Sequence, residues 1–206
     1  MRPADDKVVL LDESGRAIGE QDRTSVHSAS TPLHLAFSLY LHNDRGQVLF
    51  TRRALHKLTW PGVWTNSCCG HPRPGEHIED GLRRRLHEEL GVEVADLWCA
   101  LPDFAYRARD VSGIWENEVC PVFVGRLVHP DEPLRPNGNE VMDWTWVEWA
   151  DVKAAVLSAS FAFSPWAVEQ VTGLPQQIAN TPARPELSPA PRLVPAAAAA
   201  PAPPSP

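Results

Sequence analysis

Three histidines and two glutamates lie at positions from which they could share one metal ion. His27 and His34 are seven residues apart, and His71 follows a pair of cysteines. Glu116 and Glu118 alternate along a predicted strand, so both carboxylates point to one face. Three imidazoles with two carboxylates suit Zn²⁺ or Mn²⁺, and the mixed nitrogen and oxygen set is compatible with octahedral Mn²⁺. Each residue taken alone also fits a structural role, because no short motif links the five.

A second polar group lies between Gly70 and Val92. This span follows the pattern G-x5-E-x7-R-x-U-x-E-E-x-G-U, in which U is an aliphatic residue. The pattern is filled by Gly70, Glu76, Arg84, Leu86, Glu88, Glu89, Gly91 and Val92. It resembles the Nudix box, a loop-helix-loop whose helix carboxylates hold a divalent metal that in turn holds a diphosphate.

One position departs from the box. The residue after the box arginine is normally glutamate, and here it is Arg85. A cation in place of a carboxylate removes charge that would help to hold several Mg²⁺ ions, and it places a positive group where a phosphate can use it. We therefore do not expect ordinary diphosphate hydrolysis.

Further motifs extend the resemblance beyond the box. They are HLAFS, TNSCCGHP, ENEVCPVF, NEVMDW and FSPW. Together they make the chain similar to the type I isopentenyl diphosphate isomerases, a family with the Nudix fold, over roughly residues 5 to 172. The resemblance implies an α/β (α+β) fold in which a mixed β-sheet is packed between helices, and the alternation of strand and helix patterns is compatible with it.

The resemblance also implies roles for individual residues. The metal ligands match His27, His34, His71, Glu116 and Glu118. The two acid/base residues match Cys69 and Glu118, with Tyr106 assisting. Cys69 is assigned the chemistry because it directly precedes Gly70-His71, as in the motif, and Cys68 is expected to be a packed or spectator thiol.

A diphosphate site follows from the same resemblance. Glu89 would hold Mg²⁺ together with the diphosphate. The cations that match the family's diphosphate ligands are Arg53, Lys57 and Arg85. Arg23 stands where the best-known members have lysine, so charge is kept while geometry can change. Trp166 matches a tryptophan whose indole face stabilises a carbocation through the ring quadrupole.

The implied reaction interconverts isopentenyl diphosphate and dimethylallyl diphosphate in isoprenoid biosynthesis. Protonation of the terminal alkene carbon gives a tertiary carbocation, and loss of a proton from the neighbouring methylene completes a 1,3 shift. One acid and one base are needed on opposite sides of a flat substrate. We expect Glu118, aided by Tyr106, to deliver the proton and Cys69 to remove one, and the sequence leaves the reverse assignment open.

Hydrophobic spacing predicts the elements that must position these residues. Ile78, Leu82, Leu86 and Leu90 recur every fourth residue, which predicts an amphipathic helix ending at Gly91. Strands are expected over residues 8–11, 17–19, 33–41, 48–50, 92–98, 104–108, 116–124 and 144–147. Further helices are expected over 149–158 and 165–171, and a loop over 21–32.

Composition limits the class of protein. With 206 residues, of which 43% are hydrophobic, we expect one catalytic domain with a core. A formal net charge of -7 argues against a general nucleic-acid binder, because phosphate neutralisation needs a basic surface. The N-terminus lacks a signal-like apolar segment, so we expect a cytoplasmic protein with reduced cysteines and no membrane partner. Its partner would be a small isoprenyl diphosphate, and the chain a monomer or weak homodimer.

The end of the chain has a different composition. Ten of the 21 prolines lie beyond Gly173, together with an alanine run at residues 196–200. Such a segment cannot bury enough apolar surface to offset its ordering entropy. We expect a Nudix-type isomerase domain over residues 1–172 and a disordered Pro/Ala-rich tail over 173–206.

Two other classes of protein compete with the isomerase. A Nudix diphosphohydrolase acting on a nucleotide or sugar would need the full set of box carboxylates and would have no use for Cys69. A non-catalytic module that recruits partners through its proline-rich tail would make the candidate ligands and Cys69 incidental.

Overall fold

The computed structural model describes residues 6–178, in which the strands form two sheets. The larger sheet has the order β12-β5-β4-β11-β8, and two short strands pair with its members. These strands are β4 (Phe37–His42), β5 (Gln47–Arg53), β6 (Trp64–Thr65), β7 (Cys68–Gly70), β8 (Val94–Leu101), β11 (Val122–Leu127) and β12 (Val141–Glu148). Because β11 is parallel to β4 and antiparallel to β8, the sheet is mixed.

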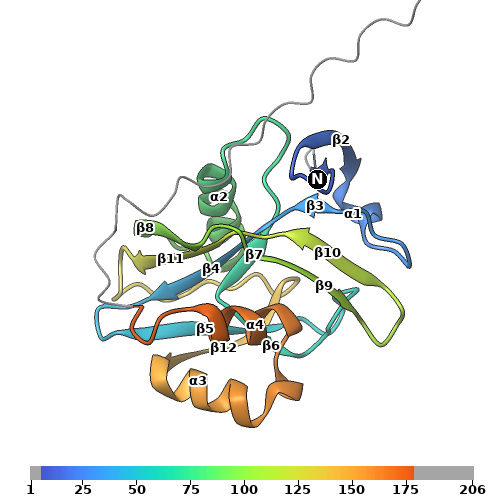
Figure 1. Cartoon of the computed structure of the whole chain (residues 1–206). Helices are drawn as coiled ribbons and strands as arrows, with labels where there is room; N and C mark the ends of the chain where they lie inside the picture. Colours follow the sequence, from blue (N-terminus) through green and yellow to red (C-terminus); the bar gives the residue numbers. More distant parts are fainter. Residues whose placement is uncertain (1–5, 179–206) are drawn as a thin grey trace, which may run out of the picture.

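The smaller sheet has the order β2-β1-β3-β10-β9. Its strands are β1 (Lys7–Leu11), β2 (Ala17–Asp22), β3 (His34–Leu35), β9 (Ala105–Arg109) and β10 (Trp115–Val119). This sheet is mixed as well, since β10 pairs in parallel with β3 and antiparallel with β9. The two sheets splay apart from a common region near β3 and β7 (Figure 1).

Helices cover both faces of the larger sheet. They are α2 (Ile78–Leu90) on one face, and α3 (Trp149–Ser158) and α4 (Pro165–Gly173) on the other (Figure 1). Leu39 and Leu41 of β4 pack in the cluster that contains the α2 leucines, whereas Tyr40 between them packs with α3 and α4. The alternation of strand side chains thus builds two core layers from one strand, and each fully buried leucine contributes about 2 kcal/mol.

The spacing-based prediction of a helix over residues 78–90 is confirmed. Leu82, Leu86 and Leu90 are fully buried, and the helix ends where Gly91 adopts a left-handed conformation with φ 68°. A non-glycine residue would be strained at this angle.

The predicted strand over residues 116–124 is wrong as a single element. It is divided into β10 and β11, and the two parts belong to different sheets. Pro121 stands at the break and has no N–H to continue the ladder, while its carbonyl accepts from Ser38 N at 3.1 Å. The expected loop over 21–32 also contains a short helix, α1 (Arg23–Val26).

The packed part of the chain extends past residue 172. Leu174 and Ile178 are buried against α3 and the larger sheet, and Trp149 Nε1 donates to the Pro175 carbonyl at 2.9 Å. The rest of the expected tail, residues 179–206, lies outside the described residues. Within residues 6–178, the structure has no helix that is both long and apolar enough to cross a membrane.

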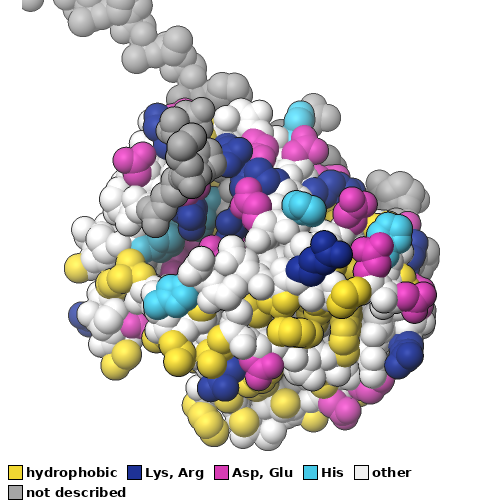
Figure 2. Space-filling model, turned by 180° about the vertical axis from the view of Figure 1, so that it is seen from behind, with side chains coloured by type: hydrophobic (Ala, Val, Ile, Leu, Met, Phe, Trp, Pro, Cys, Tyr) yellow, Lys and Arg dark blue, Asp and Glu magenta, His cyan; other side chains and the backbone are white. Residues whose placement is uncertain are grey.

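Charged side chains of both signs are interspersed on the face opposite to that of Figure 1, where they mingle with histidines (Figure 2). Hydrophobic side chains are concentrated on the lower part of the same face.

Candidate active site

A pocket of about 930 Å³ contains nearly all the residues singled out in the sequence. Its wall combines parts of both sheets with residues from α2 and α4. The predicted residues that line it are Arg23, His27, Arg53, Lys57, Cys69, His71, Arg85, Glu89, Tyr106, Glu116, Glu118 and Trp166. His34 is fully buried behind the wall. The volume is in the range of small-molecule sites.

Sheet pairing brings the candidate metal ligands together. Glu118 of β10 is the register partner of His34 on one side and of Tyr106 on the other. His71 follows β7 directly, and His27 follows α1. The ligand atoms of His27, His34, His71 and Glu118 all lie within 4.8 Å of one another.

Three imidazole nitrogens converge on one carboxylate oxygen. Glu118 Oε1 lies 3.1 Å from His71 Nε2, 3.3 Å from His34 Nε2 and 3.9 Å from His27 Nε2. His34 Nδ1 lies 2.9 Å from the Pro32 carbonyl, which can only accept. Nδ1 must therefore carry the proton, and this leaves the Nε2 lone pair free for a metal.

Glu116 stands beside this cluster. Its Oε2 is 2.8 Å from His27 Nε2, and its Oε1 accepts from the Thr59 hydroxyl at 2.7 Å. Despite this short distance, the geometry at the buried His27 Nε2 is not that of a hydrogen bond, and the atom has no hydrogen-bond partner. A buried nitrogen that makes no hydrogen bond and faces a set of N and O donors is what a bound divalent metal would satisfy. The cluster can therefore hold a divalent metal.

The histidines of the cluster differ in their affinity for protons. Burial disfavours the charged form of His27, but the carboxylates of Glu116 and Glu118 outweigh it and raise the pKa of His27 to about 9. Burial dominates at His71 and lowers its pKa to about 4, although Glu118 opposes the shift. His71 is accordingly a neutral imidazole, the form that binds metals.

The acid/base candidates carry opposite protonation states. Burial raises the pKa of the Cys69 thiol to about 11. Burial also acts to raise the pKa of Glu118, but the three histidines around its carboxylate outweigh it and hold the pKa well below its usual value. The Tyr106 hydroxyl donates to Glu118 Oε2 at 2.9 Å. A proton donor and a proton acceptor thus line one pocket.

Trp166 lies between these groups. Its ring centroid is 5.5 Å from that of Tyr106, and the Arg53 guanidinium stands 5.2 Å above the ring. The indole Nε1 donates to Asn66 Oδ1 at 3.1 Å, an oxygen that also accepts from the Cys69 thiol at 3.0 Å.

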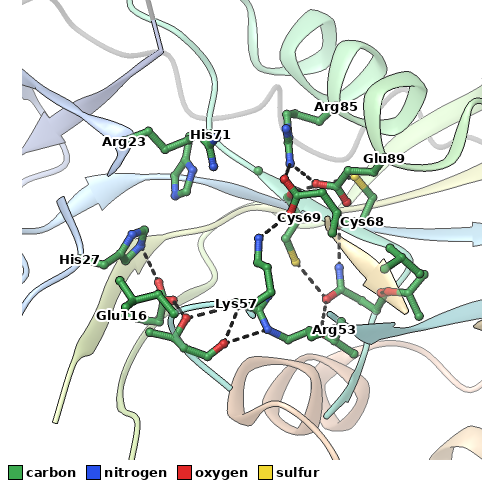
Figure 3. A pocket seen from close by; sticks show the side chains of 18 of the residues that line it. Arg23, His27, Arg53, Lys57, Cys68, Cys69, His71, Arg85, Glu89 and Glu116 are labelled. Carbon is green, nitrogen blue, oxygen red and sulfur yellow. Dashed lines mark hydrogen bonds and ion pairs between the residues drawn. The ribbon is translucent and has the colours of Figure 1, made fainter. Parts of the chain in front are cut away.

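Two candidate diphosphate cations are held by carboxylates. Arg85 contacts the carboxylate of Glu89 (Figure 3), and it also lies 3.0 Å from that of Glu88 and 3.3 Å from that of Glu140. Lys57 Nζ lies 2.5 Å from Glu140 Oε2, so this one carboxylate bridges both cations. A diphosphate that binds in the pocket would therefore contact cations that also contact these carboxylates.

The other two candidate cations are also held by protein groups. Arg53 donates to the carbonyls of Thr59 and Trp60 at 2.9 and 3.1 Å. Arg23 Nε pairs with Asp6 at 2.9 Å.

Three residues with a place in this site were not singled out from the sequence. Asn66 and Glu140 belong to the motifs TNSCCGHP and NEVMDW, so their positions were marked although their roles were not. Thr59 orients Glu116 and lies between motifs, where nothing in its residue type distinguishes it.

Comparison with known proteins gives the family. The family model of the NUDIX domain matches residues 32–167. The isopentenyl-diphosphate Delta-isomerase of Mycolicibacterium vanbaalenii is 58% identical over 164 residues, which cover 80% of this chain and 88% of the relative. The enzyme of the same name from Frankia alni is 56% identical over 173 residues, which cover 84% and 87%.

Solved structures agree with the fold. The DR0079 protein of Deinococcus radiodurans superposes with a TM-score of 0.62 at 20% identity, covering 81% of this chain and 97% of that one. A MutT protein of Methanosarcina mazei superposes with a TM-score of 0.52 at 18% identity, covering 68% and 91%. The fold is thus that of the Nudix proteins, and the long stretches of high identity place the chain more narrowly: it belongs to the isopentenyl-diphosphate Delta-isomerase family.

Proposed function

We propose that this protein interconverts isopentenyl diphosphate and dimethylallyl diphosphate by moving a proton across the alkene. The observation that carries the proposal is the common pocket, in which the Cys69 thiol and the Glu118 carboxylate face one space beside the indole of Trp166. A 1,3 proton shift needs this combination of one acid, one base and a surface that stabilises a cation.

The proton transfers are assigned to groups already in place. Glu118, with the Tyr106 hydroxyl bonded to it, delivers a proton to the terminal alkene carbon, and Cys69 removes one from the neighbouring methylene. With a thiol at Cys69 and a carboxylate at Glu118, the protein has the protonation states of the reverse assignment. These are also the states from which the proposed pair runs the reaction in reverse, with Cys69 protonating the former methylene carbon and Glu118 taking back a proton from the methyl group.

The diphosphate serves as a handle. Lys57 and Arg85 lie together at one side of the pocket, with Glu89 beside Arg85. We assign Glu89 to Mg²⁺ that arrives with the diphosphate, and Arg23 and Arg53 to further diphosphate contacts. Anchoring the charged end lets binding energy position the small hydrocarbon between acid and base.

A divalent metal in the histidine cluster would be held by His27, His34, His71 and Glu118, with Glu116 at hand, and we assign it as Mn²⁺ or Zn²⁺. When bound, such an ion orients the carboxylate and adjusts its acidity.

The deciding experiment is incubation with isopentenyl diphosphate and Mg²⁺ in deuterated buffer, with and without Mn²⁺ or Zn²⁺. Deuterium in dimethylallyl diphosphate is the expected result. Phosphate release without isomerised product would overturn the proposal in favour of a diphosphohydrolase. Absence of any turnover with each metal would instead favour a non-catalytic module.

A further inference from the structure

Asn66 uses every polar atom of its side chain inside the protein. It is fully buried in the turn between β6 and β7. Its Oδ1 accepts from the Thr65 hydroxyl at 2.9 Å, the Cys69 thiol at 3.0 Å and Trp166 Nε1 at 3.1 Å. Its Nδ2 donates to the carbonyls of Cys68 at 2.8 Å and Leu39 at 3.2 Å. The amide has only one orientation, because a rotated amide would set nitrogen against three donors and oxygen against two carbonyls.

This arrangement gives Cys69 and Trp166 one shared anchor. Both side chains donate to the same Oδ1, and the Nδ2 of the same amide donates to the backbone of β4 and β7. We infer that Asn66 is a positioning residue, which holds the Cys69 thiol and the Trp166 ring at fixed positions relative to each other. The inference rests on the proposed isomerase function.

The thiol is restrained on its other side as well. Ser38 Oγ lies 3.5 Å from Cys69 Sγ and accepts from Gln170 Nε2 at 2.9 Å. The amide of Gln170 accepts in turn from the Tyr40 hydroxyl at 3.1 Å. Because Asn66 Oδ1 can only accept, the thiol hydrogen points to Asn66, and the sulfur lone pairs remain for Ser38 and the pocket.

The hydrocarbon of the substrate makes such positioning necessary. Its reacting carbons have no polar group by which the protein could orient them, so the acid, base and ring must be placed by the protein itself. A misplacement of about 1 Å in such a site costs roughly 100-fold in rate. The diphosphate cations Lys57 and Arg85 have no hydrogen bond to Asn66, so substrate affinity should depend little on it.

The test compares Asn66→Ala with Ser67→Ala. Ser67 is equally buried, but its hydroxyl bonds the backbone of Leu49 at 2.6 Å and Leu41 at 2.7 Å rather than the site. Asn66→Ala is expected to lower kcat by roughly 100-fold with KM within about threefold, since the cations stay in place. Ser67→Ala is expected to lower thermal stability without lowering kcat.

The outcomes separate this inference from the proposed function. If the parent protein does not isomerise, the proposed function fails. If the parent protein isomerises its substrate and Asn66→Ala retains the parent's kcat, the positioning role is overturned. A raised KM together with a lowered kcat in Asn66→Ala would overturn it as well. Should Asn66→Ala not fold, Asn66→Ser gives the same comparison, because its hydroxyl is too short to reach both Cys69 and Trp166.

Discussion

Two adjacent thiols have different surroundings because successive strand residues face opposite ways. Cys68 packs with the α2 leucines in the core of the larger sheet, whereas Cys69 packs with Tyr106 and Trp166. The predicted division of labour between them therefore corresponds to a difference in side-chain environment. Their matched size and neighbouring positions make each the control for the other.

Cys69→Ala should lower kcat by about 10²- to 10⁴-fold, the contribution expected of a positioned acid or base, with little change in diphosphate binding. Cys68→Ala should keep kcat and lower the free energy of unfolding by about 1 kcal/mol, because it removes one buried atom from a packed core. Steady-state kinetics and urea unfolding measure both. Near-normal turnover by Cys69→Ala would remove the thiol from the mechanism.

The histidine cluster allows a test by metal content. His71→Ala should lower the affinity for the metal by a large factor, because it deletes a ligand from the cluster. The loss should exceed the roughly 10- to 100-fold expected when a residue that only hydrogen-bonds to a ligand is mutated. His42→Ala is the matched control, since His42 is buried on β4 and bonds the Asn43 carbonyl instead. Metal retained after dialysis against a chelator gives the readout. Equal retention in both variants would exclude His71 as a ligand.

At the scale of elements, the spacing of residues predicted the features that depend on neighbouring parts of the sequence. The four-residue recurrence of leucines gave α2, and period-two alternation put Glu116 and Glu118 on one face of β10. Spacing did not predict that β10 and β11 belong to different sheets, because periodicity carries no information on partners. Glu118 and His34 meet through a parallel contact between distant segments. Only the family resemblance, which implied that both bind one metal, predicted that these two residues lie close together.

Element boundaries can be tested at the end of α2. Gly91→Ala should lower the free energy of unfolding by about 1 kcal/mol. The residue has φ 68°, and an added Cβ would meet Arg135 Cβ at 3.0 Å. Gly138→Ala is the control, because a Cβ there meets nothing within 4 Å. Urea unfolding compares the two, and equal stability would mean that the helix end tolerates a side chain.

At the scale of the molecule, the proposed diphosphate side of the pocket joins three distant parts of the chain. Lys57 follows β5, Arg85 lies on α2 and Glu140 precedes β12. Glu140 contacts both cations, and its backbone carbonyl accepts from Ala54 N at 3.0 Å. A largely buried charge cluster of this kind links catalytic geometry to global stability, because removing one partner leaves another uncompensated.

The contribution of this cluster should depend on pH. Burial alone would raise the pKa of Glu140, but Lys57 and Arg85 outweigh it and lower the pKa from 4.5 to about 2. The stabilisation is therefore complete above pH 4.5 and is lost as pH falls towards 2, where the folded carboxylate also takes up a proton. Glu140→Gln should be less stable than the parent at pH 7 by about 1 to 3 kcal/mol, and the difference should shrink as pH falls. Urea unfolding between pH 7 and 2.5 measures this difference in stability, with Glu132→Gln as the control at an exposed position. A difference that stays constant with pH would show that Glu140 is not held ionised by these two cations.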